Sequence, residues 1–301
     1  MTELEIEAFL SIVRNGTLSA SAKELFVTQP ALSRRLKALE TELGYSLIKR
    51  GKGKQTVQLT EAGKAFWPVA EKWQYLWAET GTALNLSQRP VVKLASVGSV
   101  STYLLPPVFH IFLEKNPNYN MEFHEYHSKE AYGYAESGLI DMAFVTDPMY
   151  SDKVQSIPAF SERYVLISKC KQTMNHKKRI HPTQLCPESE VRLPWSLEYD
   201  SWHKNWFDEK IYPKVYLDQM SLMEDFLIGN NWAIVPISVG RKMQEKGCFL
   251  YELEEGPGNR IIYYLKRENR KQKMIDDFLN LLHQHLQVQE GMTSLLQLDR
   301  L

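Results

Sequence analysis

Residues 18–44 contain the pattern that most constrains the fold of this chain. A short helix is expected over about 19–26, with Ser19 as its cap, and a second helix begins at Thr28-Gln29-Pro30. Thr28 is a favoured capping residue, and proline suits a first helical turn because its missing N–H has no helical partner there. Leucines at 32, 36, 39 and 43 form one apolar stripe, and Gly44 ends the helix. Two short helices with a tight connection, the second amphipathic and basic, define a helix-turn-helix.

The flanking segments extend this motif into a winged domain, expected at residues 1–58. A helix over about 4–15 precedes it and ends at Asn15-Gly16. Residues 45–50 and 55–59 are typical of strands, and the glycine-rich stretch 51–54 between them forms a turn. A basic hairpin directly after the second helix of the motif is a wing.

A long helix is expected over 60–86, within a linker segment 59–90 that ends in the polar residues 87–90. Its apolar positions recur at spacings of four and three, which is typical of a coiled-coil seam and favours pairing with a second copy of the chain. The alternative is a helix that packs on its own domain. The seam residues are Ala62, Phe66, Val69, Trp73, Leu76, Thr80 and Leu84.

Charge is distributed unevenly along a chain whose net charge is zero. Residues 1–64 hold ten basic and seven acidic side chains, whereas the other residues hold 26 basic and 29 acidic ones. A basic N-terminal part on a slightly acidic body indicates a polyanionic partner for that part. A solvated charged face is the alternative.

Residues 91–301 show a different organisation, in which apolar strands alternate with helices. This alternation indicates an α/β domain with a largely parallel sheet. No apolar run is long enough for a membrane span, and the N-terminus lacks the features of a signal peptide. Three widely spaced cysteines argue against a disulfide framework, so we expect a cytoplasmic protein.

The residue types of the second helix and the wing predict how each would meet DNA. The first residues of a recognition helix reach base edges, and Gln, Arg, Ser and Pro all have suitable base contacts. Flanking basic residues suit phosphates, which supply affinity rather than sequence information. The base-facing set is Gln29, Pro30, Ser33 and Arg34, with Thr28 beside it, and the phosphate-facing set is Arg35, Lys37, Arg50, Lys52 and Lys54.

Residues 4–63 resemble the winged helix-turn-helix of the LysR-type transcriptional regulators. The matching stretches are Ala22-Lys23-Glu24-Leu25, Thr28-Gln29-Pro30-Ala31-Leu32-Ser33-Arg34, Leu39-Glu40, Glu42-Leu43-Gly44 and Leu59-Thr60-Glu61-Ala62-Gly63. The resemblance continues more weakly to the C-terminus. It implies a regulator that binds double-stranded promoter DNA, forms a homodimer or a homotetramer through the 60–86 helix, and contacts RNA polymerase if it is an activator.

The resemblance also implies that residues 91–301 are an effector-binding domain of the periplasmic-binding-protein type. Lobe I would comprise about 91–163 and 268–301, and lobe II about 164–267. Ligands of open α/β sheets bind at the carboxyl ends of strands, and a hydroxyl-rich helix start suits an anion; an ordinary helix-capping cluster is the alternative. The candidate effector-binding residues are Ser96, Gly98, Ser99, Val100, Ser101, Thr102, Ser128, Thr146, Trp195, Ser196, Met220 and Ser221.

These observations favour a DNA-binding regulator that is switched by a small, anionic effector. A constitutive DNA-binding protein with a non-functional sensor and a solute-binding protein are the alternatives. No catalytic residue and no cofactor are expected, because the chain lacks GxSxG, P-loop, GxGxxG and HExxH motifs. His124 and His127 would point to opposite faces of a strand, which is poor geometry for a metal.

Overall fold

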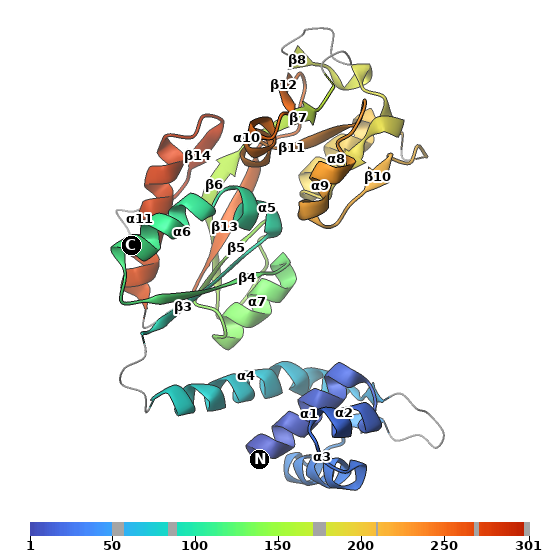
Figure 1. The fold of residues 1–301 in the computed structure, drawn as a ribbon, viewed down its shortest axis with the longest axis vertical. Coiled ribbons are helices and arrows are strands. Elements are labelled where there is room, and N and C mark those ends of the chain that lie inside the picture. The colour runs from blue at the N-terminus through green and yellow to red at the C-terminus, as the bar shows by residue number, and fades with distance from the viewer. Residues whose placement is uncertain (50–56, 84–88, 171–178, 209, 268–270, 298–301) are drawn as a thin grey trace. The chain divides into compact units, whose positions relative to one another are not determined.

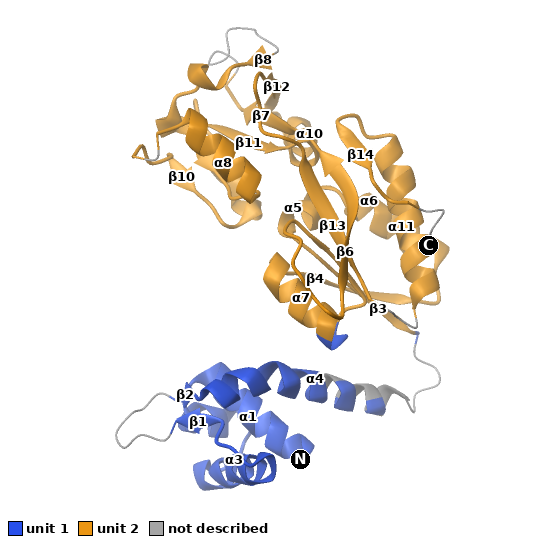
Figure 2. Ribbon diagram, turned by 180° about the vertical axis from the view of Figure 1, so that it is seen from behind, with its two compact units in different colours: residues 1–89, 137–139 blue, residues 90–136, 140–301 orange. Residues whose placement is uncertain are grey.

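A computed structural model describes residues 1–49, 57–83, 89–170, 179–208, 210–267 and 271–297. They form two compact units (Figure 2). Unit 1 comprises residues 1–89 and 137–139, and unit 2 comprises residues 90–136 and 140–301. In the described part of the chain, no helix is long and apolar enough to cross a membrane.

Three helices form the core of unit 1: α1 (Glu3–Asn15), α2 (Leu18–Glu24) and α3 (Gln29–Leu43). Thr17 rather than Ser19 caps α2, because its hydroxyl accepts a hydrogen bond from the Ala20 N–H at 3.1 Å. The helix ends before Phe26, whose φ of +52° lies in the left-handed region. The predicted bounds of this helix, 19–26, are therefore wrong at both ends.

The wing and the long helix follow α3. Strands β1 (Ile48–Lys49) and β2 (Gln58–Leu59) pair antiparallel, with Ile48 opposite Leu59. Helix α4 (Glu61–Ala83) includes Pro68, and residues 84–86 of the predicted helix lie outside the described residues.

The seam of α4 divides between two environments. Phe66 is buried against Phe9, with ring centroids 5.5 Å apart, and Trp73 packs on the same core. The seam residues Val69 and Leu76 stay exposed, as does Trp77 next to Leu76. The seam therefore does not serve self-pairing alone, since part of it closes the core of unit 1.

Lobe I of unit 2 is a six-stranded sheet in the order β14-β6-β13-β5-β3-β4 (Figure 1). Its strands are β3 (Val91–Ser96), β4 (Asn120–Glu125), β5 (Met142–Val145), β6 (Gln155–Glu162), β13 (Arg260–Lys266) and β14 (Met292–Ser294). Its helices are α5 (Gly98–Tyr103), α6 (Pro106–Lys115), α7 (Ser128–Ser137) and α11 (Gln272–Gln287). The half formed by β3, β4 and β5 is parallel, whereas β13, β6 and β14 run antiparallel.

Alternating side chains place helices on both faces of the lobe I sheet. Leu94 and Phe144 share an apolar cluster with residues of α6 and α11, whereas Ala95 and Val145 pack against residues of α7. A strand presents successive side chains to opposite faces, so a sheet covered on both sides needs continuous apolar strands. The Met142–Val145 strand is buried throughout for this reason.

Lobe II contains a four-stranded sheet, β11-β7-β12-β8, and a two-stranded sheet, β10-β9. The strands are β7 (Tyr164–Ser168), β8 (Arg179–Ile180), β9 (Val191–Arg192), β10 (Val215–Tyr216), β11 (Trp232–Pro236) and β12 (Phe249–Leu253). The helices are α8 (Leu197–Trp206), α9 (Met223–Phe226) and α10 (Ile237–Glu245), and three 3₁₀ turns are η2 (Pro182–Gln184), η3 (Pro187–Ser189) and η4 (Met220–Leu222). Two of its pairings, β11 with β7 and β12 with β7, are antiparallel, and its parallel pairings, β12 with β8 and β10 with β9, are two residues long each. The largely parallel sheet that we expected is therefore found mainly in one half of lobe I.

The chain passes between the lobes at two places. It leaves lobe I at Glu162, where β6 ends and β7 begins two residues later, and it returns at Arg260, where β13 begins. Arg260 pairs with Glu162 in the register of β13 and β6. The strand 260–266 therefore belongs to lobe I, and the predicted limit of lobe II at 267 is wrong. This strand is assigned to lobe I by its pairing with segments that are distant in the sequence, and no local sequence pattern reveals such pairing.

Candidate functional site

Helix α3 presents the predicted base-facing residues on its solvent side. Gln29, Pro30 and Arg34 are exposed and Ser33 is half-buried, while Leu32, Leu36 and Leu39 face the core of unit 1. The Thr28 hydroxyl accepts a hydrogen bond from the Ala31 N–H at 3.4 Å, so it serves as the helix cap. Lys37 is exposed and Arg35 is half-buried. Arg50, Lys52 and Lys54 lie outside the described residues.

A buried carboxylate connects α3 with the wing, and no local pattern in the sequence indicates it. Glu40 lies on the core side of α3 and is 7% exposed. One of its oxygens accepts hydrogen bonds from the N–H groups of Leu47 at 2.7 Å and Ile48 at 3.3 Å. These bonds fix the start of β1 relative to the helix that carries the base-facing residues.

In unit 2, a pocket of about 120 Å³ lies between elements of the two lobes. Lobe I contributes residues that follow β3, β4 and β5, at the carboxyl ends of its parallel strands, where an open α/β sheet binds ligands. Lobe II contributes the loop between β9 and α8 and the segment before η4. The lining residues are Val97, Gly98, Ser99, Glu125, His127, Thr146, Leu193, Pro194, Trp195, Asp218, Met220 and Arg260.

Five of the twelve predicted effector-binding residues line this pocket: Gly98, Ser99, Thr146, Trp195 and Met220. They come from four separate segments of both lobes. The indole N–H of Trp195 donates to the Ile234 carbonyl at 2.8 Å, which fixes the ring.

The structure does not bring the other seven residues to the pocket. Ser96 and Val100 are buried, and Thr102 and Ser221 are exposed elsewhere. The Ser101 hydroxyl donates to the Gly98 carbonyl at 2.9 Å, and Ser196 caps α8.

The seventh, Ser128, supports the pocket wall from behind. Its hydroxyl lies 3.2 Å from the Thr146 hydroxyl and donates to Asp147 Oδ2 at 3.1 Å. The position of these residues after predicted strands identified loops that line the pocket. It did not show which hydroxyl groups within a loop face the pocket.

Arg260 is the main pocket residue that the sequence did not reveal. Its side chain is 3% exposed and lies over the Trp195 ring, 5.4 Å from the centroid. Nη2 donates to Ser99 Oγ at 2.9 Å, and Nη1 lies 3.4 Å from Glu162 Oε1. Nε is buried and has no hydrogen-bond partner among the described residues. The sequence feature that could have indicated this role is a charged residue at the start of an apolar strand.

Glu162 connects this arginine with α10 of lobe II. Its Oε2 accepts hydrogen bonds from the Ser238 hydroxyl at 2.6 Å and the Ser238 N–H at 3.3 Å. Complete burial raises the pKa of the Glu162 carboxyl, although Arg260 and Ser238 oppose that effect. The Glu162 carboxyl therefore joins β6, β13 and α10 at the point where the chain changes lobes.

Acidic groups occupy the rim of the same pocket. Glu125 is the last residue of β4, and its Oε2 lies 3.2 Å from the Ser101 hydroxyl, whose proton it shares with the Gly98 carbonyl. Asp218 precedes η4 and is exposed. A buried guanidinium and two carboxylates thus face one small volume.

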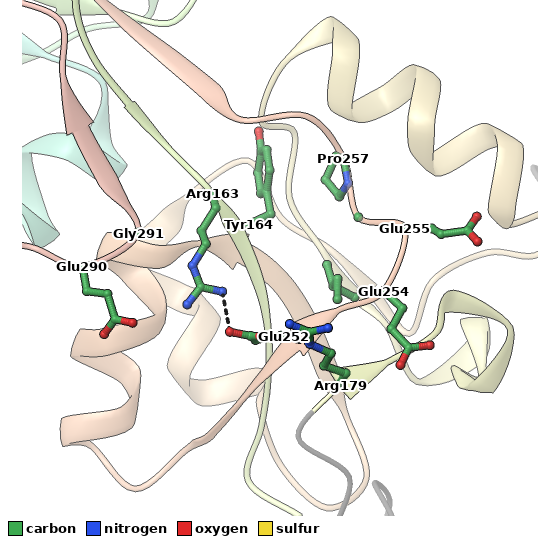
Figure 3. A pocket seen from close by; sticks show the side chains of 11 residues that line it. Arg163, Tyr164, Arg179, Glu252, Glu254, Glu255, Pro257, Glu290 and Gly291 are labelled. Carbon is green, nitrogen blue, oxygen red and sulfur yellow. Dashed lines mark hydrogen bonds and ion pairs between the residues drawn. The ribbon is translucent and has the colours of Figure 1, made fainter.

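A second hollow, of about 690 Å³, is lined entirely by other residues (Figure 3). Glu252 lies within it, 3.5 Å from Arg163 Nη1 and 3.0 Å from Arg179 Nε. Both arginines therefore share the Glu252 carboxylate as an ion-pair partner. One lining residue, Tyr164, has a buried hydroxyl without a hydrogen-bond partner among the described residues, but none of the predicted effector-binding residues lines the hollow.

The histidines and cysteines give no metal site in the described ranges, where no group of three or more His, Cys, Asp or Glu residues is arranged to hold an ion. His124 Nε2 lies 2.7 Å from Glu122 Oε1, and its ring stacks on Tyr126. The three cysteines are free thiols.

A winged helix-turn-helix unit and a two-lobed α/β unit with a pocket between its lobes together define a transcription regulator with a ligand-sensing domain. Residues 4–64 match the family described as "Bacterial regulatory helix-turn-helix protein, lysR family", and residues 87–287 match "LysR substrate binding domain". The chain belongs to the LysR family of bacterial transcriptional regulators. The family resemblance and the predicted fold class are thereby confirmed.

Curated relatives agree with this assignment. The chain is 26% identical over 195 residues to the HTH-type transcriptional regulator BenM of Acinetobacter baylyi, which is 62% of each chain. It is 31% identical over 144 residues to a probable RuBisCO transcriptional regulator of Trieres chinensis, which is 47% of this chain and 46% of the relative. The matches thus span about half to three fifths of these relatives.

Solved structures share the fold over nearly the whole chain. The LysR family regulator CbnR has a TM-score of 0.71 at 20% identity, over 95% of this chain and 99% of that chain. A full-length OxyR variant from Pseudomonas aeruginosa has a TM-score of 0.61 at 16% identity, over 94% of this chain and 95% of that chain.

Proposed function

We propose that this protein binds promoter DNA through unit 1 and that a small effector with an anionic group, bound in the pocket of unit 2, sets that binding. The observation that carries the effector half is Arg260, a buried guanidinium whose Nε–H has no partner among the described residues. A buried donor without a partner costs about 1–3 kcal/mol, and more when it is charged, so a ligand acceptor that reaches this N–H would recover that free energy. Ser99 Oγ, already fixed by Arg260, adds a second polar group beside it.

The DNA half is supported by the exposed side of α3. Gln29, Pro30 and Arg34 lie on one solvent-facing surface at the start of the helix, where recognition helices meet base edges. The similar protein CbnR has been solved at full length in complex with its target DNA. A helix-turn-helix reads about half of a two-fold site, so a second copy of the chain completes the contact. Val69, Leu76 and Trp77 of α4 are exposed and suit that pairing.

The switch works through closure of the lobes. A ligand that touches Ser99 in lobe I and Trp195 in lobe II binds better when the lobes are closed than when they are open. The free energy available for changing DNA affinity is the difference between those two ligand affinities. The effector is a dissociable ligand rather than a cofactor, RNA polymerase is the further partner if the protein activates transcription, and the site of action is the cytoplasm.

Footprinting and fluorescence anisotropy test this function. Full-length protein is titrated against DNA flanking its own gene, at several salt concentrations, with and without small carboxylic acids. We expect a protected site and a change in its affinity with one acid. Ser99→Ala should abolish that change and leave effector-free DNA affinity unaltered, whereas Thr102→Ala, on the same helix outside the pocket, should behave as wild type. Absence of any footprint refutes the DNA half, and a footprint that no acid changes favours a constitutive regulator.

A further inference from the structure

The rim of the pocket contains charges that a simple carboxylate ligand does not explain. Glu125 and Asp218 both line it, one from each lobe. Within the described part of the chain, Glu125 accepts a side-chain hydrogen bond only from Ser101, and Asp218 is exposed. Two carboxylates around a volume of about 120 Å³ would repel a second negative charge on the ligand.

We propose that the pocket recognises a zwitterion, an amino acid or another small compound with one carboxylate and one protonated amine. This inference rests on the proposed function and specifies its effector class. The ligand carboxylate binds at Arg260 and Ser99, and the ammonium group binds between Glu125 and Asp218.

The carboxylate end is defined by a built donor set. The Arg260 side chain is 3% exposed, its Nη2 is fixed by Ser99 Oγ at 2.9 Å, and its Nε has no partner among the described residues. Glu162 lies 3.4 Å from Nη1 and balances the charge of the guanidinium, so the pocket is not a strong sink for anions in general. Recognition of the carboxylate therefore depends on directed hydrogen bonds, which Arg provides in a fixed geometry.

At the ammonium end of the pocket, the packing of the backbone at Gly98 determines where the Glu125 carboxylate lies. A Cβ atom on Gly98 would lie 2.6 Å from Glu125 Oε1, so the absence of a side chain at position 98 lets this carboxylate reach the pocket beside Ser99. Glu125 and the carboxylate-binding Ser99 are therefore close neighbours. An amine and a carboxylate separated by one or two carbons suit that proximity.

The size of the pocket limits the ligand. Its volume of about 120 Å³ is well below the roughly 300–1,000 Å³ of pockets that hold drug-sized ligands. A small amino acid therefore matches this volume better than a nucleotide or a sugar phosphate. Opposite charges at the two ends also fix the orientation of the ligand between lobes, because Asp218 comes from lobe II and Ser99 from lobe I.

Calorimetric titration of the full-length protein tests the proposal. The probes are the twenty L-amino acids and their des-amino counterparts, for example alanine with propionate and glutamate with glutarate. We expect at least one amino acid to bind at least tenfold more tightly than its des-amino counterpart. A carboxylate that binds equally well without its amine overturns the proposal, and so does a lack of binding by every amino acid.

Three variants locate the ammonium site. Glu125→Gln and Asp218→Asn should each weaken amino-acid binding about tenfold and leave des-amino acids unaffected, while Gly98→Ala should do the same by displacing the Glu125 carboxylate. Glu122→Gln, which changes a carboxylate of the same strand that contacts Lys93 and His124, is the matched control. Unchanged amino-acid affinity in all three variants refutes the assignment.

The failure of this inference is distinguishable from failure of the proposed function. A des-amino acid that binds through Ser99 and changes DNA affinity would leave the regulator intact and remove only the ammonium site. Loss of the DNA footprint itself would remove the function. Each result is read from the same protein preparation.

Discussion

Gly63 lies at a close approach between α4 and the wing, and its substitution by alanine tests how unit 1 is held together. A Cβ atom at this position would lie 2.0 Å from the Leu47 carbonyl oxygen. Because real Cβ atoms essentially never come within 3.0 Å of such an atom, the two backbones must separate by about 1 Å. The Leu47 carbonyl accepts the Thr60 N–H at 3.0 Å, and the Thr60 hydroxyl donates to the Ser46 carbonyl at 2.7 Å, so both bonds are disturbed.

The expected loss of stability follows from three contributions, of which one stabilises the variant and two destabilise it. Alanine gains about 1 kcal/mol over glycine in a helix. Overpacking costs about 1–3 kcal/mol, and each weakened hydrogen bond costs about 1 kcal/mol. Gly63→Ala should therefore destabilise unit 1 by about 2–4 kcal/mol, which corresponds to a change of about 30- to 900-fold in its opening equilibrium.

Hydrogen exchange followed by mass spectrometry is the suitable assay, because it reports unit 1 and unit 2 separately. The control is Gly133→Ala in α7, where a new Cβ meets no atom within 4 Å. That variant should stabilise its helix by about 0.5–1 kcal/mol. Protection in α1–α4 that stays unchanged or rises in Gly63→Ala would refute the reasoning, since the same substitution must have opposite signs at the two glycines.

Three further predictions concern single charged groups. Arg34→Ala should weaken specific DNA binding by about 1–3 kcal/mol and non-specific binding much less, as measured by anisotropy with competitor DNA; equal losses would identify a phosphate contact. Burial raises the pKa of Glu162 in the folded protein, so its ionisation is costly there. Glu162→Gln should therefore become more stable relative to the wild type as the pH rises above the ordinary carboxyl pKa of 4.5. Denaturant titrations of both proteins between about pH 4 and 8 check this, and a difference in free energy of unfolding that does not change with pH would contradict it. His203→Ala should lower the free energy of unfolding of lobe II by about 3–5 kcal/mol, because it leaves the buried Glu190 carboxylate without the imidazole at 2.9 Å. An equal loss of stability in the double variant Glu190→Gln/His203→Ala would show that the unpaired carboxylate is not the cause.

The elements that could be predicted from the sequence are those defined by local pattern. The leucine stripe, the Thr28 cap and Gly44 together specify α3, and the structure gives it as residues 29–43. The cap of α2 was misplaced because Thr17 and Ser19 are both good capping residues, and the left-handed backbone at Phe26 is unusual for a bulky side chain.

The pocket was predictable only in part. Ser99 was identified because it follows the first strand of lobe I. Arg260 was missed because its partners Ser99 and Glu162 are 161 and 98 residues away in the sequence. No periodicity or capping signal connects residues at such distances. The assignment of the Arg260 strand to lobe II failed for the same reason.

One of the two residues at which the chain changes lobes, Arg260, lines the pocket, and the other, Glu162, contacts it directly. Glu162 ends one crossing strand, Arg260 begins the other, and their side chains bind Ser238 in lobe II and Ser99 in lobe I respectively. A mutation that retunes which ligand is accepted at Arg260 therefore also changes the stiffness of the joint. Substitutions at Arg260 that change effector specificity would thus also alter how the lobes move. The acidic residues Glu125 and Asp218 line the same pocket but form no hydrogen bond with Arg260, Glu162 or Ser238 among the described residues, so a variant with a new ligand is more readily reached through them.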